Sequence, residues 1–143
     1  MNSVYTHMLV PVATASLMNG LIFSQKLRIA TNRNPYIPGG GIVGAIWLFL
    51  FALLGYVHFT LYTRNNTFTP GCIILILFFL YSLAYPVLTS FSGDPKVFTG
   101  LNFGALLFAL AIAFQVFNEN PKVILYVVPL IAWTSYVNVV TLL

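Results

Sequence analysis

Long apolar segments without charge restrict what this chain can fold into. A helix needs about 20 mostly apolar residues to cross the hydrocarbon core of a bilayer. Five segments meet that length, at residues 5–25, 41–63, 71–91, 98–117 and 122–143. The chain of 143 residues is 59% hydrophobic and 6% charged, and so small a protein cannot bury that much apolar surface inside itself. We therefore predict an all-α integral membrane protein, a single domain over residues 1–143 built as a five-transmembrane-helix bundle.

Charge and cysteine content exclude several other classes of protein. The net charge of +4 is spread over six Lys and Arg residues, so there is no basic patch that would predict nucleic-acid binding. The single cysteine, Cys72, excludes an internal disulfide and a cysteine-based metal cluster. Residues 1–7 lack the basic start of a cleaved signal peptide, so we expect the first segment to be retained as a span.

The distribution of basic residues predicts the orientation of a multi-pass protein. Cytoplasmic loops carry an excess of Lys and Arg. Four basic residues follow the first and third segments, namely Lys26, Arg28, Arg33 and Lys96. Only Arg64 and Lys122 lie on the opposite side. This bias predicts that the loop at residues 26–40 and the C-terminus are cytoplasmic, with the N-terminus across the membrane and the membrane itself unidentified.

The sequence contains no recognisable catalytic constellation. Its two acids, Asp94 and Glu119, fall in predicted loops on opposite sides of the membrane, where they cannot form the carboxylate pair of a hydrolase. No Asp, Glu, Lys or Arg falls at membrane depth in the predicted spans, whereas ion-coupled transporters place such residues there. These absences disfavour an enzyme and an ion-coupled transporter.

Polar residues inside the predicted spans have two interpretations. Asn19, Asn102, Gln115 and Asn138 can form hydrogen bonds between helices or line a ligand cavity. His58 is expected to have no second histidine on its face, so we predict no metal site there. An axial role for His58 toward haem stays open.

Two of the predicted spans carry an aromatic stripe. One is formed by residues spaced to share a helix face, namely Trp47, Phe51, Leu54 and His58. The other comprises Pro129, Trp133, Val137 and Val140. The indole of Trp133 falls near mid-membrane, away from the interfaces where Trp is usually enriched. The stripes indicate either packing within a bundle or the aromatic wall of an apolar pocket.

Several of these segments resemble one known family. The stretches "LVP" at residues 9–11, "NPYIPGG" at 34–40, "VGAIWLFLFALLGY" at 43–56 and "VVPLIAWTSY" at 127–136 are similar to motifs of the TspO family, the translocator or tryptophan-rich sensory proteins. Trp47, Gly55 and Trp133 match the family pattern, whereas Tyr36 stands where Trp is usual and Ala45 replaces a Pro. In the third segment the family's Gln and Asn-Trp are also replaced.

The resemblance implies a five-helix membrane protein with a pocket beneath the first long loop. Such a pocket takes porphyrin, haem or sterol-like ligands, requires no cofactor and uses no metal or catalytic residue. Carried over position by position, the implied ligand-binding residues are Asn19, Ile22, Tyr36, Val43, Gly44, Ile46, Trp47, Leu83, Trp133, Val137 and Val140. The surrounding partner is membrane lipid.

The resemblance also implies a homodimer, for which small residues of the third and fourth segments would serve, such as Gly104, Ala105, Ala109 and Ala111. Gly55 is expected to allow close contact between helices. Two alternatives to a binding protein remain at this point. One is a structural subunit of a larger membrane complex, and the other is a light-dependent porphyrin-degrading enzyme.

Overall fold

The computed structural model describes residues 3–24 and 35–143, and the side chains of residues 22–24 are outside this description. Every regular element among the described residues is helical. The α-helices are α1 (Val4–Ser24), α2 (Gly40–Asn65), α3 (Pro70–Ser92), α4 (Pro95–Glu119) and α5 (Val128–Leu142), with the 3₁₀-helix η1 (Pro121–Tyr126) before α5. The predicted all-helical fold class is confirmed.

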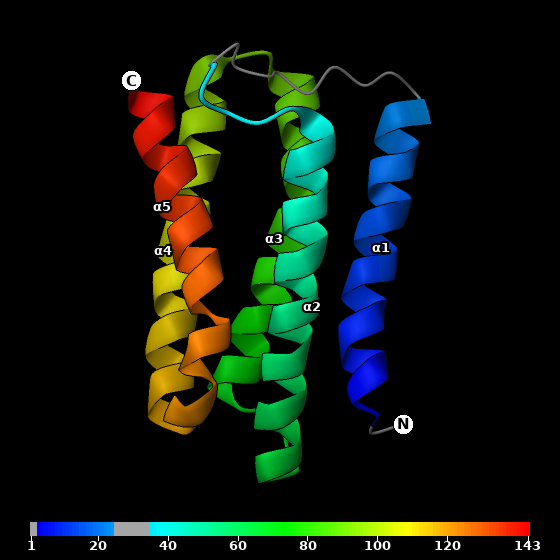
Figure 1. The fold of residues 1–143 in the computed structure, drawn as a ribbon, viewed down its shortest axis with the longest axis vertical. Helices are drawn as coiled ribbons and strands as arrows, with labels where there is room; N and C mark the ends of the chain where they lie inside the picture. Colours follow the sequence, from blue (N-terminus) through cyan, green and yellow to red (C-terminus); the bar gives the residue numbers. More distant parts are fainter. Residues whose placement is uncertain (1–2, 25–34) are drawn as a thin grey trace.

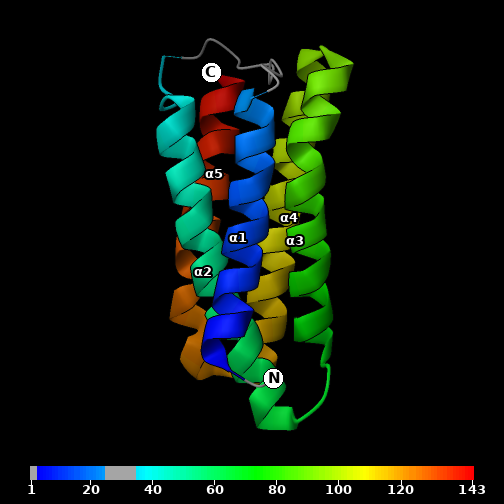
Figure 2. The same cartoon turned by 90° about the vertical axis from the view of Figure 1, so that its right-hand side faces the viewer.

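The helices run side by side along the long axis of the molecule (Figure 1). The N-terminus and the C-terminus lie at opposite ends of the bundle (Figure 1). Helix α1 packs mainly against α2, while α4 packs against both α3 and α5. A quarter turn of the view shows α1 in front of α2 and α3 (Figure 2). The first helix therefore covers one side of the bundle.

Three of the helices are long and apolar enough to cross a membrane by themselves, namely α2, α3 and α4. Their bounds agree with the predicted spans to within three residues at each end. The last predicted span, residues 122–143, is divided between η1 and α5. Pro129 lies in the first turn of α5, where a missing N–H group is tolerated, so a new α-helix starts there.

The exterior of the bundle is apolar on every long helix. Large hydrophobic side chains that are more than half exposed occur on all five α-helices, as at Leu17, Phe49, Leu80, Phe114 and Val139. The interior is formed by the fully buried side chains of Phe78, Leu50, Leu61, Ile112 and Leu130. A protein whose inside and outside are both apolar is suited to lipid as its solvent.

Two helices begin with the same combination of a capping residue and a proline. The Thr69 hydroxyl accepts a hydrogen bond from the Cys72 N–H (3.2 Å) at the start of α3. The Asp94 carboxylate accepts one from the Lys96 N–H (2.8 Å) at the start of α4. A proline follows each cap, at the position where its lack of an N–H costs least.

The second acid, Glu119, joins two helices that are far apart in sequence. Its carboxylate at the end of α4 accepts hydrogen bonds from the Gly71 N–H (2.7 Å) and from the Thr69 hydroxyl (2.5 Å). It therefore supplies negative charge at the N-terminus of α3, where the helix dipole favours it. Both acids of the chain thus serve helix N-termini, at opposite ends of α4.

Two glycines allow helices to approach closely. A Cβ atom on Gly55 of α2 would lie 2.2 Å from the backbone oxygen of His7 in α1, so the expectation of close helix contact at Gly55 is confirmed. A Cβ atom on Gly104 of α4 would lie 2.5 Å from the Tyr81 hydroxyl of α3. At Gly55 the neighbour is backbone, so a side chain there would force the helices apart, whereas at Gly104 the Tyr81 side chain would have to shift.

The assignment of small α4 residues to a dimer face is wrong for two of the four residues proposed, Ala105 and Ala109. Gly104 contacts Tyr81 of the same chain. Ala105 is 6% exposed and Ala109 is fully buried within the core. Small side chains on α4 therefore serve packing inside the chain, because α3 and α5 both lie against this helix.

We expect Gly55→Ala to destabilise the protein by roughly 1–3 kcal/mol, because the added methyl group would overlap the α1 backbone. Gly100→Ala in α4 is the matched control, since nothing lies within 4 Å of its Cβ position. In that open helical position alanine should be neutral or stabilising by up to about 1 kcal/mol. Unfolding in mixed micelles, followed by circular dichroism, measures both. Equal effects of the two changes would contradict the close approach.

We expect Glu119→Gln to lower the free energy of unfolding by about 1–2 kcal/mol, because one of the two donors at the start of α3 would then face an amide N–H₂ group. Asp94→Asn is the control, since asparagine caps a helix as well as aspartate does. The same unfolding measurement compares them, and a larger loss in Asp94→Asn would overturn the assignment.

Candidate functional site

An apolar pocket of about 280 Å³ lies between α1, α2 and α3. Each helix contributes residues from one stripe of its surface. They are Thr6, His7, Val10 and Pro11 of α1, Phe51, Leu54, Gly55 and His58 of α2, and Leu75, Ile76, Phe78 and Phe79 of α3. None of these residues is acidic, and none is Lys or Arg. The pocket therefore favours an uncharged apolar guest.

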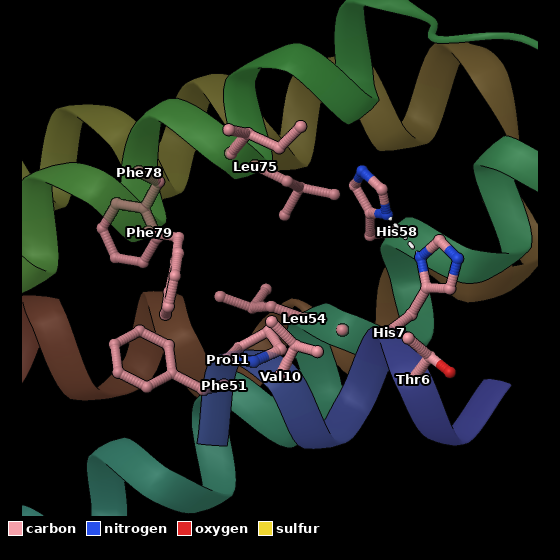
Figure 3. A pocket seen from close by; sticks show the side chains of 12 residues that line it. Thr6, His7, Val10, Pro11, Phe51, Leu54, His58, Leu75, Phe78 and Phe79 are labelled. Atoms are coloured by element: carbon pink, nitrogen blue, oxygen red, sulfur yellow. Dashed lines mark hydrogen bonds between the residues drawn. The ribbon is translucent and has the colours of Figure 1, made fainter. Parts of the chain in front are cut away.

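The two ends of the pocket differ in chemistry (Figure 3). Phe51, Phe78 and Phe79 gather at one end, where the rings of Phe51 and Phe79 meet edge to face at 5.4 Å between centroids. The two histidines lie at the other end (Figure 3). Because α1 starts and α2 finishes near the histidines, the polar end lies toward one end of the bundle and the aromatic end toward its middle.

The pocket lies on the side of the bundle where α1 meets α3. Helix α1 packs closely on α2 but has much less contact with α3. On that side Val10 of α1 and Ile76 of α3 line the pocket and are 55% and 38% exposed. A guest can therefore reach the pocket from the side, between these two helices.

The two histidines of the chain face each other directly. The Nδ1 atoms of His7 and His58 are 2.8 Å apart, and the ring centroids are 5.0 Å apart. The expectation that His58 would have no second histidine beside it is wrong. The two residues are 51 positions apart in sequence and meet because their helices cross closely at Gly55.

Aromatic rings surround this histidine pair. The ring of His7 lies 5.5 Å from Phe59 and 5.8 Å from Tyr62, and the ring of His58 lies 6.1 Å from Phe68, between centroids. The Nε2 atom of His58 is buried and has no hydrogen-bond partner. One hydrogen bond therefore joins the pair, and the buried Nε2 atom of His58 has no hydrogen-bond partner among the surrounding groups.

Chemically, the described part of the chain offers no metal centre of the usual kind. No group of three or more His, Cys, Asp or Glu residues forms there, whereas a closed zinc site uses four ligands. The Cys72 thiol lies 3.9 Å from the backbone oxygen of His58 and is fully buried. The site can bind by shape, ring contact and hydrogen bonding.

Of the residues implied by the family resemblance, Trp47 packs against two residues of this pocket. Its ring is 5.6 Å from that of Phe51 and 6.2 Å from that of Phe78, between centroids, and both phenylalanines line the pocket. Three members of the predicted stripe on α2, namely Phe51, Leu54 and His58, line the pocket themselves. The stripe thus identified the correct face of α2.

Several other implied residues make contacts away from this pocket. Asn19 of α1 lies beside Gly44 of α2, with its Nδ2 atom 3.5 Å from the Cβ position of that glycine. Trp133 stacks on Tyr136 at 5.8 Å between centroids, and the Tyr136 hydroxyl donates a hydrogen bond to the Tyr36 backbone oxygen. The loop and the last helix are therefore in contact.

The remaining implied residues have different degrees of exposure. Val140 is buried, while Val43, Ile46, Leu83 and Val137 are half-buried. The side chain of Ile22 lies outside the described residues. None of the implied residues whose side chains are described lines the pocket between α1, α2 and α3.

A polar cluster connects α3, α4 and α5. The Tyr85 hydroxyl donates to the Asn102 side-chain oxygen (2.8 Å), and the Asn138 amide donates to the Asn102 backbone oxygen (2.9 Å). Asn102 is 6% exposed, and its Nδ2 atom is buried without a partner. The prediction of hydrogen bonds between helices is confirmed for Asn102 and Asn138.

Comparison with protein-family models, with curated proteins and with solved structures finds no match for this chain. The molecule is an all-helical protein with three helices compatible with membrane crossing. The resemblance to the TspO family stays a prediction.

We expect Tyr85→Phe to destabilise the protein by about 0.6–1.7 kcal/mol, because Asn102 would lose its one side-chain partner inside the bundle. Tyr81→Phe is the control, since the Tyr81 hydroxyl donates to a backbone oxygen, that of Leu101 (2.6 Å), within helix α4. The control should cost less. Unfolding in micelles measures both, and a larger loss in Tyr81→Phe would contradict this prediction.

Proposed function

We propose that this chain is a membrane-embedded binding protein for a flat apolar ligand of the porphyrin, haem or sterol kind, with all five α-helices crossing the membrane. The observation that carries the proposal is the aromatic-walled apolar pocket between α1, α2 and α3. It requires no cofactor and no catalytic residue, and the ligand itself is the partner.

The surface of the molecule supports placement in a membrane. Helices α2, α3 and α4 are long and apolar enough to cross, and α1 and α5 run alongside them in both views (Figures 1 and 2). Exposed apolar side chains on α1 and α5, such as Leu17 and Val139, continue the same exterior. Lipid can solvate such a surface, whereas water cannot do so at low cost.

The shape and chemistry of the pocket support a flat apolar ligand. Three phenylalanine rings offer faces and edges, and ring contacts of this kind contribute about 0.5–1.5 kcal/mol each beyond area burial. The volume of about 280 Å³ is near the lower end of ligand pockets, which hold about 300–1,000 Å³. A larger ligand would extend through the open side between Val10 and Ile76 into lipid.

A substitution at the pocket mouth tests this proposal. Ile76→Phe adds volume at a residue that lines the pocket and is partly exposed. We expect it to weaken ligand binding about tenfold, equivalent to about 1.4 kcal/mol. Leu80→Phe, one turn further along α3, is the matched control, because Leu80 is 55% exposed and does not line the pocket.

Fluorescence of Trp47 provides the measurement, since this indole packs directly behind Phe51 and Phe78. The Trp133→Phe background leaves Trp47 as the reporter. Titration with protoporphyrin IX, and separately with a sterol carrying a Trp-quenching group, should show saturable quenching in Leu80→Phe and weaker binding in Ile76→Phe. Quenching that rises linearly with both probes would contradict a binding site and favour a structural subunit of a membrane complex.

A further inference from the structure

In this closed arrangement the histidine pair carries two ring hydrogens, one on each neutral imidazole. One hydrogen lies between the two Nδ1 atoms, which are 2.8 Å apart, so one ring donates and the other accepts. The Nε2 atom of His58 is buried without a partner. If His58 donates from its Nδ1 atom to the Nδ1 atom of His7, the Nε2 atom of His58 carries a lone pair and no hydrogen. No buried N–H group is then left without an acceptor. The second hydrogen of the pair is then on the His7 ring, which is partly exposed.

A further proton has no suitable place in this closed arrangement. If it were added at His58 Nε2, a charged N–H group would be buried without an acceptor. If it were added at His7 Nδ1, either the hydrogen bond would be lost or the His58 hydrogen would move to the same buried Nε2 atom. Unpartnered buried charge is strongly unfavourable. Uptake of a proton is therefore linked to separation of the two rings.

Separation of the rings would act directly on α1. His7 lies at the point where α1 crosses α2 against Gly55, and α1 has far less contact with α3. Val10 and Pro11, one turn along from His7, form the α1 wall of the pocket. Movement of this part of α1 would remove that wall.

We propose that the His7–His58 pair is a proton-operated latch, in which uptake of a proton releases the start of α1 from α2 and opens the pocket between α1 and α3. The movement follows from the pair alone, while its effect on a ligand rests on the proposed function. Histidine suits such a switch because its charge changes near physiological pH, and an ionisable pair inside a membrane protein is usually functional.

The other titratable groups near the pair do not supply the missing acceptor. On α2 the Tyr62 ring faces His7 at 5.8 Å, and on α3 the Cys72 thiol bonds to the His58 backbone oxygen. The Glu119 carboxylate is occupied by Thr69 and Gly71 at the start of α3. Helix α1 itself contains no Asp, Glu, Lys or Arg.

The latch is tested by measuring the position of α1 without any ligand. Spin labels are placed on exposed residues outside the pocket, through Leu9→Cys on α1 and Leu77→Cys on α3, in a Cys72→Ala background and with the full chain in lipid nanodiscs. The label-to-label distance is measured by pulsed electron resonance between about pH 8 and about pH 4, from above the ordinary histidine pKa of about 6.5 to well below it.

We expect a longer-distance population that grows on acidification by up to about tenfold per pH unit for one linked proton. The matched control replaces both histidines, His7→Asn with His58→Asn, because asparagine places an amide near the Nδ1 position and does not titrate. That variant should keep the short distance at every pH. A distance independent of pH in the parent, or the same pH response in the control, would overturn the latch.

Two additions keep the test decisive. If that double variant does not fold, His7→Phe with His58→Phe takes its place, because phenylalanine at position 7 retains the ring contacts with Phe59 and Tyr62 and neither position then titrates. Protoporphyrin quenching of Trp47 is then measured at each pH. A pH-dependent distance without saturable quenching would retain the latch and reject the proposed ligand, so the two proposals fail separately.

Discussion

The close crossing of α1 and α2 at Gly55 is the contact on which the other features of this bundle depend. Without a side chain at that position the backbone of α1 reaches the backbone of α2, which brings His7 to within 2.8 Å of His58. The same crossing places Val10 and Pro11 over Leu54 and forms the first wall of the pocket. In lipid, helix association relies on such packing and on hydrogen bonds, because apolar surface gains little by leaving the bilayer.

Polar groups fix the other helices by a different means. Glu119 joins the end of α4 to the start of α3 through Thr69 and Gly71, and Asn102 joins α4 to α3 and α5 near the opposite end. These hydrogen bonds mainly specify one arrangement of the helices and contribute less to the free energy of unfolding. In another arrangement a polar group inside lipid would have no partner. The start of α1 is tied to α2 by the hydrogen bond between His7 and His58, so a change in this pair would act on that part of the helix.

The positions of the helices could be predicted from the sequence, but the contacts between helices could not. Length and apolarity predicted the helical segments closely, and the stripe of Phe51, Leu54 and His58 predicted the face of α2 that lines the pocket. The meeting of His7 with His58 was missed because nothing local couples positions 51 residues apart. The helices are apolar all round, so hydropathy does not distinguish core from lipid-facing sides. Pro129 indicated the break before α5, but the prediction followed the length of the apolar segment and treated residues 122–143 as one span.

The pocket opens sideways between α1 and α3, and this would affect the apparent affinity of any molecule that binds there. In the proposed membrane setting, a guest that passes between Val10 and Ile76 would come from the acyl chains rather than from water, so its relevant concentration would be its mole fraction in the bilayer. Solutes that partition strongly into lipid are already enriched around the protein. A shallow recess with a weak intrinsic preference would then be filled at trace aqueous levels, and apparent affinity would fall whenever extra lipid or detergent diluted the solute.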